Sequence, residues 1–255
     1  YHDLDTVFYP FPITDILEIV GRDRYIQHET PVGFSMSGNV IEGSPEDNHC
    51  IRAYHLLKKD FPDLPPIAMH LHKMIPSGAG LGGGSSDGSF SLSLLNAKFG
   101  LGISEEKLLE YALQLGSDCP FFIINKPCSA GGRGELLRCT EVNLESYGLM
   151  LINPGIHIST KLAFDGILPA VPEKSCAEIT GQPPETWKDK LQNDFEKPIF
   201  EKFPEIRKIK EMLYEAGAMY ASMTGTGSSV YGIFPAGIEP DRDMFPQAYF
   251  VFTKR

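Results

Sequence analysis

The chain has 255 residues and a formal net charge of −10, and 42% of its residues are hydrophobic. This length and apolar content suffice for one large or two modest domains. The acidic balance argues against nucleic acid as a general partner, because backbone phosphates need clustered Lys and Arg. Five cysteines without C-x-x-C spacing favour reduced thiols in a cytoplasmic protein. No apolar run reaches about 18 residues, so no membrane partner is predicted.

The first clear elements in chain order surround a glycine-rich loop. Residues 67–73 alternate apolar and polar side chains, which predicts a strand. Five glycines follow within residues 78–84, and then Ser, Ser and Asp at 85–87, which are good N-caps. The apolar residues in 88–99 predict a helix. A strand, a glycine loop and a helix start in this order typically bind phosphate, because unpaired amides and the helix dipole attract an anion.

The loop alone does not identify the phosphate ligand. Gly78, Gly80 and Gly83 match G-x-G-x-x-G, but no acidic residue ends a strand about 20 residues later, as a dinucleotide site requires. No Gly-Lys-Ser/Thr follows, which excludes a P-loop. H-R-D and D-F-G segments are absent, which excludes a protein kinase. A flexible linker is disfavoured because the loop lies between a strand and a helix.

The remaining elements indicate a second half of the molecule. Ser104 precedes a helix predicted over residues 105–115. Apolar runs and turn residues then predict a buried strand at 148–152 with a turn at 153–155, a surface excursion at 168–184, a helix at 196–216, and strands at 230–234 and 248–252. We therefore expect two domains, residues 1–145 and residues 146–255.

Several segments together resemble the GHMP small-molecule kinases. Residues 76–87 resemble the second motif of that family, including a triple glycine. Matching segments occur in the expected order at residues 1–8, 46–48, 115–122, 131–137, 193–196 and 223–229. The resemblance covers nearly the whole chain. It implies an α+β GHMP kinase fold with an N-terminal domain like ribosomal protein S5 domain 2, a ferredoxin-like C-terminal domain, and the site in the cleft.

The same resemblance implies ATP as phosphoryl donor, with Mg²⁺. The implied nucleotide-binding residues are Pro76, Gly78, Gly80, Leu81, Gly82, Gly83, Gly84, Ser85 and Ser86 in the loop, with Asn48 and Lys73 at the adenine. Without the resemblance, Lys73 is interpreted as a solvated charge at a strand end. The sequence identifies no metal ligands, and Ser86 is only a candidate to approach the ion.

The implied acceptor is a small molecule, a cytidine diphosphate-linked methylerythritol. Its implied binding residues are Tyr1, His2, Thr160, Phe164, Gly225, Thr226 and Gly227. Tyr1 and Phe164 correspond to aromatics that sandwich the cytosine, and His2 to the residue that reads its edge. Two alternatives remain open: Phe164 is a core residue, and the loop at 224–229 is a tight turn between a helix and a strand.

Asp118 is the candidate catalytic carboxylate. It follows Gly-Ser and precedes Cys-Pro, directly after the helix predicted at 105–115. A carboxylate near the acceptor hydroxyl can take or orient its proton. The alternative is a capping or loop-stabilising Asp. Family members begin with an Ala-Lys-Ile-Asn-Leu segment whose lysine would pair with this carboxylate. Because the chain opens at Tyr1, we expect about two dozen further residues that include this lysine.

Two rival functions remain open. One is a GHMP kinase that acts on a different alcohol, and the other is a non-catalytic nucleotide-binding protein of the same fold. His70 and His72 have metal-like spacing on the polar face of the strand, but no third ligand is evident, so no metal site is predicted.

Overall fold

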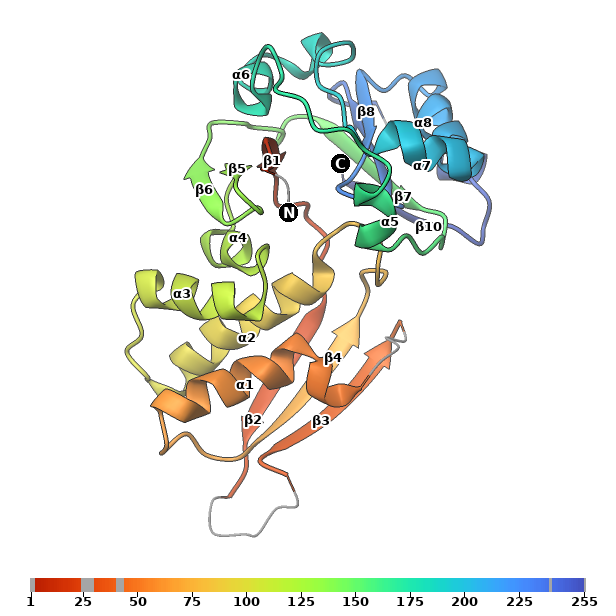
Figure 1. The fold of residues 1–255 in the computed structure, drawn as a ribbon. Helices are drawn as coiled ribbons and strands as arrows, with labels where there is room; N and C mark the ends of the chain where they lie inside the picture. Colours follow the sequence, from red (N-terminus) through yellow and green to blue (C-terminus); the bar gives the residue numbers. More distant parts are fainter. Residues whose placement is uncertain (1–2, 24–29, 40–43, 239, 255) are drawn as a thin grey trace.

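The computed structural model describes residues 3–23, 30–39, 44–238 and 240–254. Figure 1 shows two lobes with a small sheet between them. The lower lobe has the sheet order β2-β4-β3, in which β4 is antiparallel to β2 and parallel to β3. Two helices, α1 and α2, pack on this sheet, and α3 packs on these two helices. These elements are β2 (Ile16–Gly21), β3 (Val32–Gly38), α1 (His49–Asp60), β4 (Ile67–Lys73), α2 (Gly83–Phe99) and α3 (Glu105–Leu115).

Alternation along β4 positions the core of the lower lobe. Ile67, Met69 and Leu71 are buried, while the intervening side chains face away from the helices. The strand predicted at residues 67–73 is therefore confirmed. The helix predicted at 105–115 is also confirmed, and the hydroxyl of Ser104 caps it by accepting from Lys107 N.

The start of α2 differs from the expectation. The helix begins at Gly83, and its N-cap is Gly82 in a left-handed conformation with φ 66°. Residues 85–87 therefore lie in the first turns of the helix, and the interpretation of these residues as N-caps is wrong. Glycine adopts positive φ at little cost, so the chain enters the helix earlier than a side-chain cap would allow.

The upper lobe has an antiparallel sheet with strand order β10-β7-β9-β8. In chain order this is 4-1-3-2, the arrangement of a ferredoxin-like domain. Helix α8 (Pro204–Glu215) packs on β8 and β9. Between β9 and β10, the only helical segment in the described residues is a 3₁₀ turn, η3 (Arg242–Met244). The strands are β7 (Gly148–Asn153), β8 (Tyr220–Met223), β9 (Val230–Phe234) and β10 (Phe250–Lys254).

Two predictions in this lobe need correction. The helix expected at 196–216 is two helices, α7 (Glu196–Lys202) and α8 (Pro204–Glu215). Phe203 separates them with ψ 76°, because a residue before proline is pushed out of the helical region. The final strand lies at Phe250–Lys254, two residues later than expected, and β8 was not predicted.

A third sheet lies between the lobes, with the order β1-β5-β6 (Figure 1). Helix α4 packs against α2 and α3. The segment 168–184, which was predicted to be a surface excursion, contains helix α6, and Ser175 caps the start of this helix. The remaining elements are β1 (Thr6–Phe8), η1 (Pro45–Asp47), α4 (Cys119–Ile124), β5 (Cys128–Gly131), β6 (Leu136–Cys139), α5 (Thr160–Phe164), α6 (Cys176–Thr180) and η2 (Pro184–Thr186). The domain boundary at residue 145 stays a prediction. Within the described residues, no helix has the length and apolar character needed to cross a membrane.

Candidate active site

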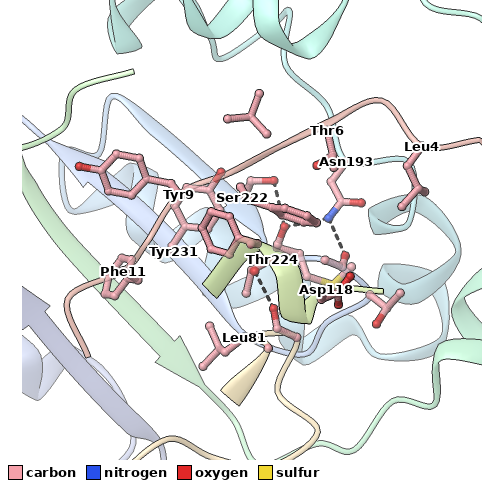
Figure 2. Close-up of a pocket in the computed structure, with 18 of the residues that line it drawn as sticks. Leu4, Thr6, Tyr9, Phe11, Leu81, Asp118, Asn193, Ser222, Thr224 and Tyr231 are labelled. Carbon is pink, nitrogen blue, oxygen red and sulfur yellow. Dashed lines mark hydrogen bonds between the residues drawn. The ribbon is translucent and has the colours of Figure 1, made fainter. Parts of the chain in front are cut away.

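A cleft of about 2180 Å³ lies where the glycine loop, β1, the start of α4 and the loops of the upper lobe meet. Figure 2 shows Leu81, Asp118 and Thr224 in this cleft. The structure thus brings together segments far apart in sequence. The predicted site residues that line the cleft are Gly78, Gly80, Leu81, Gly82, Ser86, Asp118, Thr160, Phe164, Gly225, Thr226 and Gly227.

The glycine loop presents backbone to the cleft. Gly80 and Gly82 have φ of 70° and 66°, which glycine tolerates best. A Cβ on Gly80 would lie 2.4 Å from the carbonyl oxygen of Thr224, so the loop can lie this close to the upper lobe only without a side chain. The start of α2 has no side-chain cap, and its first amides lack partners within the helix. They are therefore available to bind an anion.

Hydrogen bonds from the upper lobe fix the glycine loop. The hydroxyl of Thr224 donates to the carbonyl oxygen of Gly80 at 2.8 Å, as drawn in Figure 2. The amide of Ser229 donates to the carbonyl oxygen of Ala79 at 3.2 Å. The loop at 224–229 joins β8 to β9, so it is a turn between two strands and not between a helix and a strand. It also supports the first loop directly.

Lys73 is buried beneath the glycine loop between two carboxylates. Its Nζ lies 2.8 Å from Asp87 Oδ2 and also contacts Asp15. Burial raises the pKa of the Asp87 carboxyl to about 6 and the nearby Asp15 carboxylate adds to the rise, although the Lys73 ammonium opposes it. The interpretation of Lys73 as a solvated charge is therefore wrong, because only 2% of the residue is exposed. Its contact with adenine stays a prediction.

The predicted nucleotide residues outside the cleft lining are Pro76, Gly83, Gly84, Ser85, Asn48 and Lys73. Asn48 caps α1, and its Oδ1 accepts from Cys50 N at 2.9 Å. The next residue, His49, places its Nδ1 3.1 Å from the carbonyl oxygen of Gly84. The start of α1 thus adjoins the glycine loop. Nucleotide binding by these residues stays a prediction.

Asp118 lies just before α4, at the edge of the cleft. It occupies the N-cap position of α4, but its side chain makes no capping hydrogen bond, so no side-chain cap is seen there. The carboxylate is accessible from the cleft, but the surrounding protein partly desolvates it and raises its pKa. Its Oδ1 is close to Gly134, where an added Cβ would lie 3.1 Å away. An accessible carboxylate with a raised pKa suits proton transfer.

The residues predicted to bind the acceptor come from two parts of the upper lobe. Thr160 and Phe164 are the first and last residues of α5, which the hydroxyl of Ser159 caps. The Phe164 ring packs edge-on against Phe195 with centroids 4.9 Å apart, and it also lines the cleft. Tyr1 and His2 lie outside the described residues. The acceptor roles of all these residues stay predictions.

Sequence reasoning missed a residue that holds the second loop. Nδ2 of Asn193 donates to the carbonyl oxygens of Met223 and Gly225, both at 2.8 Å (Figure 2). Glu196, three residues after Asn193, supports the same region, because its Oε1 accepts a hydrogen bond from Met223 N at 2.8 Å. Residues 193–196 resemble a segment of the family, but their role could not be predicted from the sequence. His157 was also missed, and it packs against Gly78 on the cleft wall.

His70 and His72 have polar partners on the neighbouring strand. Both ring nitrogens of His70 bond to Ser35 and Ser37, at 2.8 and 2.9 Å, and Nδ1 of His72 lies 2.8 Å from Ser37. In the parts of the chain that the structure describes, no three His, Cys, Asp or Glu side chains form a group that could hold a metal ion.

Comparisons with known proteins agree with this geometry. The family model for the GHMP kinases N terminal domain matches residues 48–126, and that for the GHMP kinases C terminal matches residues 178–249. A relative from Bacteroides fragilis, named 4-diphosphocytidyl-2-C-methyl-D-erythritol kinase, is 47% identical over 92% of this chain and 84% of its own length. A relative of the same name from Bacteroides thetaiotaomicron is 48% identical over 95% and 88%. A solved structure of a 4-(cytidine 5'-diphospho)-2C-methyl-D-erythritol kinase is 25% identical, with a TM-score of 0.76 over 99% of this chain and 90% of that chain.

Proposed function

Because this chain belongs to the GHMP kinase family, we propose that it transfers the γ-phosphoryl group of ATP to the 2-hydroxyl of 4-diphosphocytidyl-2-C-methyl-D-erythritol. The reaction serves the synthesis of isoprenoid precursors. The observation that carries the proposal is the identity of 47–48% to relatives of that name over 92–95% of the chain. The cleft supports it, because a phosphate-type loop and an accessible carboxylate line the same cavity.

The glycine loop binds the phosphates of ATP. Phosphoryl transfer depends mainly on positioning and on stabilising the charge of the transferred group. Uncapped amides at the start of α2 and the dipole of this 17-residue helix supply that stabilisation locally. This local supply matters because the net charge of −10 repels a triphosphate at long range.

Asp118 acts on the acceptor hydroxyl. Its carboxylate accepts or orients the hydroxyl proton while the oxygen attacks the γ-phosphorus in line with the departing ADP. The raised pKa makes the carboxylate a better proton acceptor than an ordinary Asp. Its accessibility from the cleft leaves room for the hydroxyl beside it.

The acceptor binds against the upper lobe. The aromatic ring of Phe164, with Tyr1, stacks on the cytosine, while His2 reads its edge. Thr160 and the turn at Gly225–Gly227 contact the remaining part of the substrate. Phe164, Thr160 and this turn all line the cleft, which supports one binding surface opposite the glycine loop.

Mg²⁺ fits this site as a partner of the nucleotide. Mg²⁺ prefers oxygen ligands and usually combines one or two protein groups with substrate phosphates and water. Ser86 and Asp118 both line the cleft and carry oxygen donors that suit the ion. Held there, the ion would supply positive charge beside the transferred phosphoryl group. We place the enzyme in the cytoplasm, which fits five cysteines that are all unpaired in the structure.

The test is a substrate panel with the purified full-length protein. We expect ADP formation with the cytidyl substrate, and a product that carries one added phosphate by mass spectrometry. Mevalonate and homoserine should give no more than background. Turnover of one of those alcohols in place of the cytidyl substrate would leave only the family assignment standing. ATP binding without turnover of any alcohol would favour the non-catalytic rival.

A further inference from the structure

Two cysteines face each other in the small sheet between the lobes. Cys128 opens β5 and Cys139 closes β6, and the two residues are direct partners in the antiparallel register. The amide of Thr140 donates to the carbonyl oxygen of Pro127 at 2.8 Å, so residues 127 and 140 form the hydrogen-bonded pair next to them. Pairs alternate along an antiparallel ladder, which makes 128 and 139 a non-hydrogen-bonded pair.

The other edge of β5 agrees with this assignment. The amide of Leu4 donates to the carbonyl oxygen of Gly132 at 2.8 Å, and the register then directs the backbone groups of Cys128 toward Phe8 in β1. Non-hydrogen-bonded partners have Cα atoms about 4.5 Å apart, with their side chains close together. A disulfide accepts Cα separations of about 4.4–6.8 Å. The backbone therefore needs no rearrangement to allow a cross-strand bond.

The two thiols differ in accessibility. Their Sγ atoms are 3.8 Å apart, Cys128 is fully buried, and Cys139 is exposed. We propose that Cys128 and Cys139 form a reversible disulfide when the protein meets an oxidant of the disulfide class, such as glutathione disulfide. We do not expect the other three cysteines to take part in this bond. Cys50 and Cys119 are buried, and the thiol of Cys176 donates to the carbonyl oxygen of Asp5.

The chemistry proceeds by two thiol–disulfide exchanges. The exposed Cys139 gives its proton to solvent, and its thiolate attacks glutathione disulfide, which forms a mixed disulfide and releases one glutathione thiolate. Cys128 then loses its proton, attacks the sulfur of Cys139 and releases the second glutathione thiolate. The two cysteines lose two electrons, glutathione disulfide gains them, and the two protons end on the released thiolates. Burial raises the pKa of Cys128 to about 12, which assigns it the second step.

The position of the pair connects it to the site. Between the two cysteines the chain turns at Gly132–Gly134, and Gly134 lies against both Asp118 and the ring of Phe8. Phe8 is the strand partner of Cys128 and packs on Phe121 of α4, with ring centroids 5.2 Å apart. A disulfide at the base of this hairpin would therefore restrain one wall of the cleft.

The experiment titrates the reduced, full-length protein with glutathione buffers of increasing disulfide content. We expect intact mass to fall by about 2 Da, two of the five thiols to resist alkylation, and peptide mapping to give a Cys128–Cys139 link that dithiothreitol reverses. The oxidised protein should melt about 5 °C higher, because the bond closes a loop in the unfolded chain. Amide exchange across residues 132–135 should slow.

Matched variants separate this bond from other oxidation. Cys139→Ser changes an exposed side chain, so it should fold normally and lose the link, whereas Cys176→Ser should form the link like the wild type. A stable glutathione adduct on Cys139 without the internal bond would overturn the proposal. A disulfide between two molecules through Cys139 would do so too.

Discussion

The two glycine-rich loops of the cleft differ in which backbone groups are bonded. The carbonyl groups of the loop before α2 accept from the upper lobe, and the Asp15–Lys73–Asp87 ion pairs lie below the loop, while the first amides of the uncapped helix lack partners within it. In the loop at 224–229, the carbonyl oxygen of Gly225 accepts from Asn193, as does that of Met223 just before the loop, and the Thr224 hydroxyl donates to the first loop.

This difference assigns different work to the two loops. Free amides on a rigid base suit a ligand whose charge must be stabilised, as a triphosphate requires. A loop with its polar groups already bonded is better suited to positioning and to shape recognition of a second substrate. We therefore propose that ATP binds at the first loop and the acceptor at the second, with Asp118 lining the same cleft.

The largest expected effect tests the carboxylate that both substrates share. Asp118→Asn removes the charge and nearly keeps the shape, so we expect kcat to fall at least ~10²-fold with the KM for ATP nearly unchanged. A coupled ADP assay measures both. Asp165→Asn, at an exposed position after α5, is the matched control and should behave like the wild type. A folded Asp118→Asn enzyme with normal turnover would reduce Asp118 to a structural role.

The next prediction tests whether Phe164, in α5, contacts the acceptor and not ATP. Phe164→Ala should raise the KM for the cytidyl substrate roughly 5- to 150-fold, because one stacking partner of a base is worth ~1–3 kcal/mol. ATP should be little affected. Phe164→Tyr keeps an aromatic face and should retain most of the affinity. Titrations of each variant with both substrates check the assignment, which is wrong if ATP affinity falls and the cytidyl substrate still binds.

Local patterns predicted much of the fold, and their limits are visible at particular residues. Alternation over 67–73 and the Ser104 cap depend only on neighbouring residues, so the strand and the helix there were predictable. The helix break at Phe203 could also have been predicted locally, because the next residue is Pro204. The start of α2 was not, because Gly82 takes the cap position by its left-handed backbone, which no side-chain pattern reports.

The site was predictable where a motif is contiguous. The glycine loop and Asp118 belong to short segments, and the structure brings them to one cleft. Asp15 and Asn193 act through partners 58 and 30 residues away, at Lys73 and Met223. Such roles depend on which loops meet in space, and neither composition nor spacing along the chain contains that information.

A pair of glycine substitutions sharpens the account of the first loop. Gly80→Ala places a Cβ 2.4 Å from the carbonyl oxygen of Thr224 at a positive φ, so we expect a loss of ~1–3 kcal/mol in stability and weaker ATP binding. Gly84→Ala meets no atom within 4 Å, and alanine favours the helix by ~1 kcal/mol. The melting temperature of the Gly84→Ala protein should therefore be no lower than that of the wild type.

The two variants together distinguish folding from ligand contact. If the phosphates approach the start of α2, Gly84→Ala should raise the KM for ATP while the protein stays as stable as the wild type. Thermal melts without ligand and ATP titrations give the two readouts. Unchanged ATP affinity in Gly84→Ala would move the phosphates away from this turn and toward Gly80 and Gly82.

The smallest effect concerns pH and has opposite signs for activity and stability. Burial raises the pKa of Asp118 above its ordinary value of 3.8, so turnover should fall as the pH drops through that raised pKa. The folded protein also binds this proton more tightly than the unfolded chain does, so ionisation of Asp118 lowers stability as the pH rises. Asp118→Asn never ionises, and it should melt above the wild type at pH 7. That difference should shrink as the pH falls through the raised pKa of Asp118, and it should be gone below about 3.8, where both states of the wild type carry the proton. Melting curves of both proteins across pH measure it, and a difference that does not change with pH would mean that burial does not oppose the charge on Asp118.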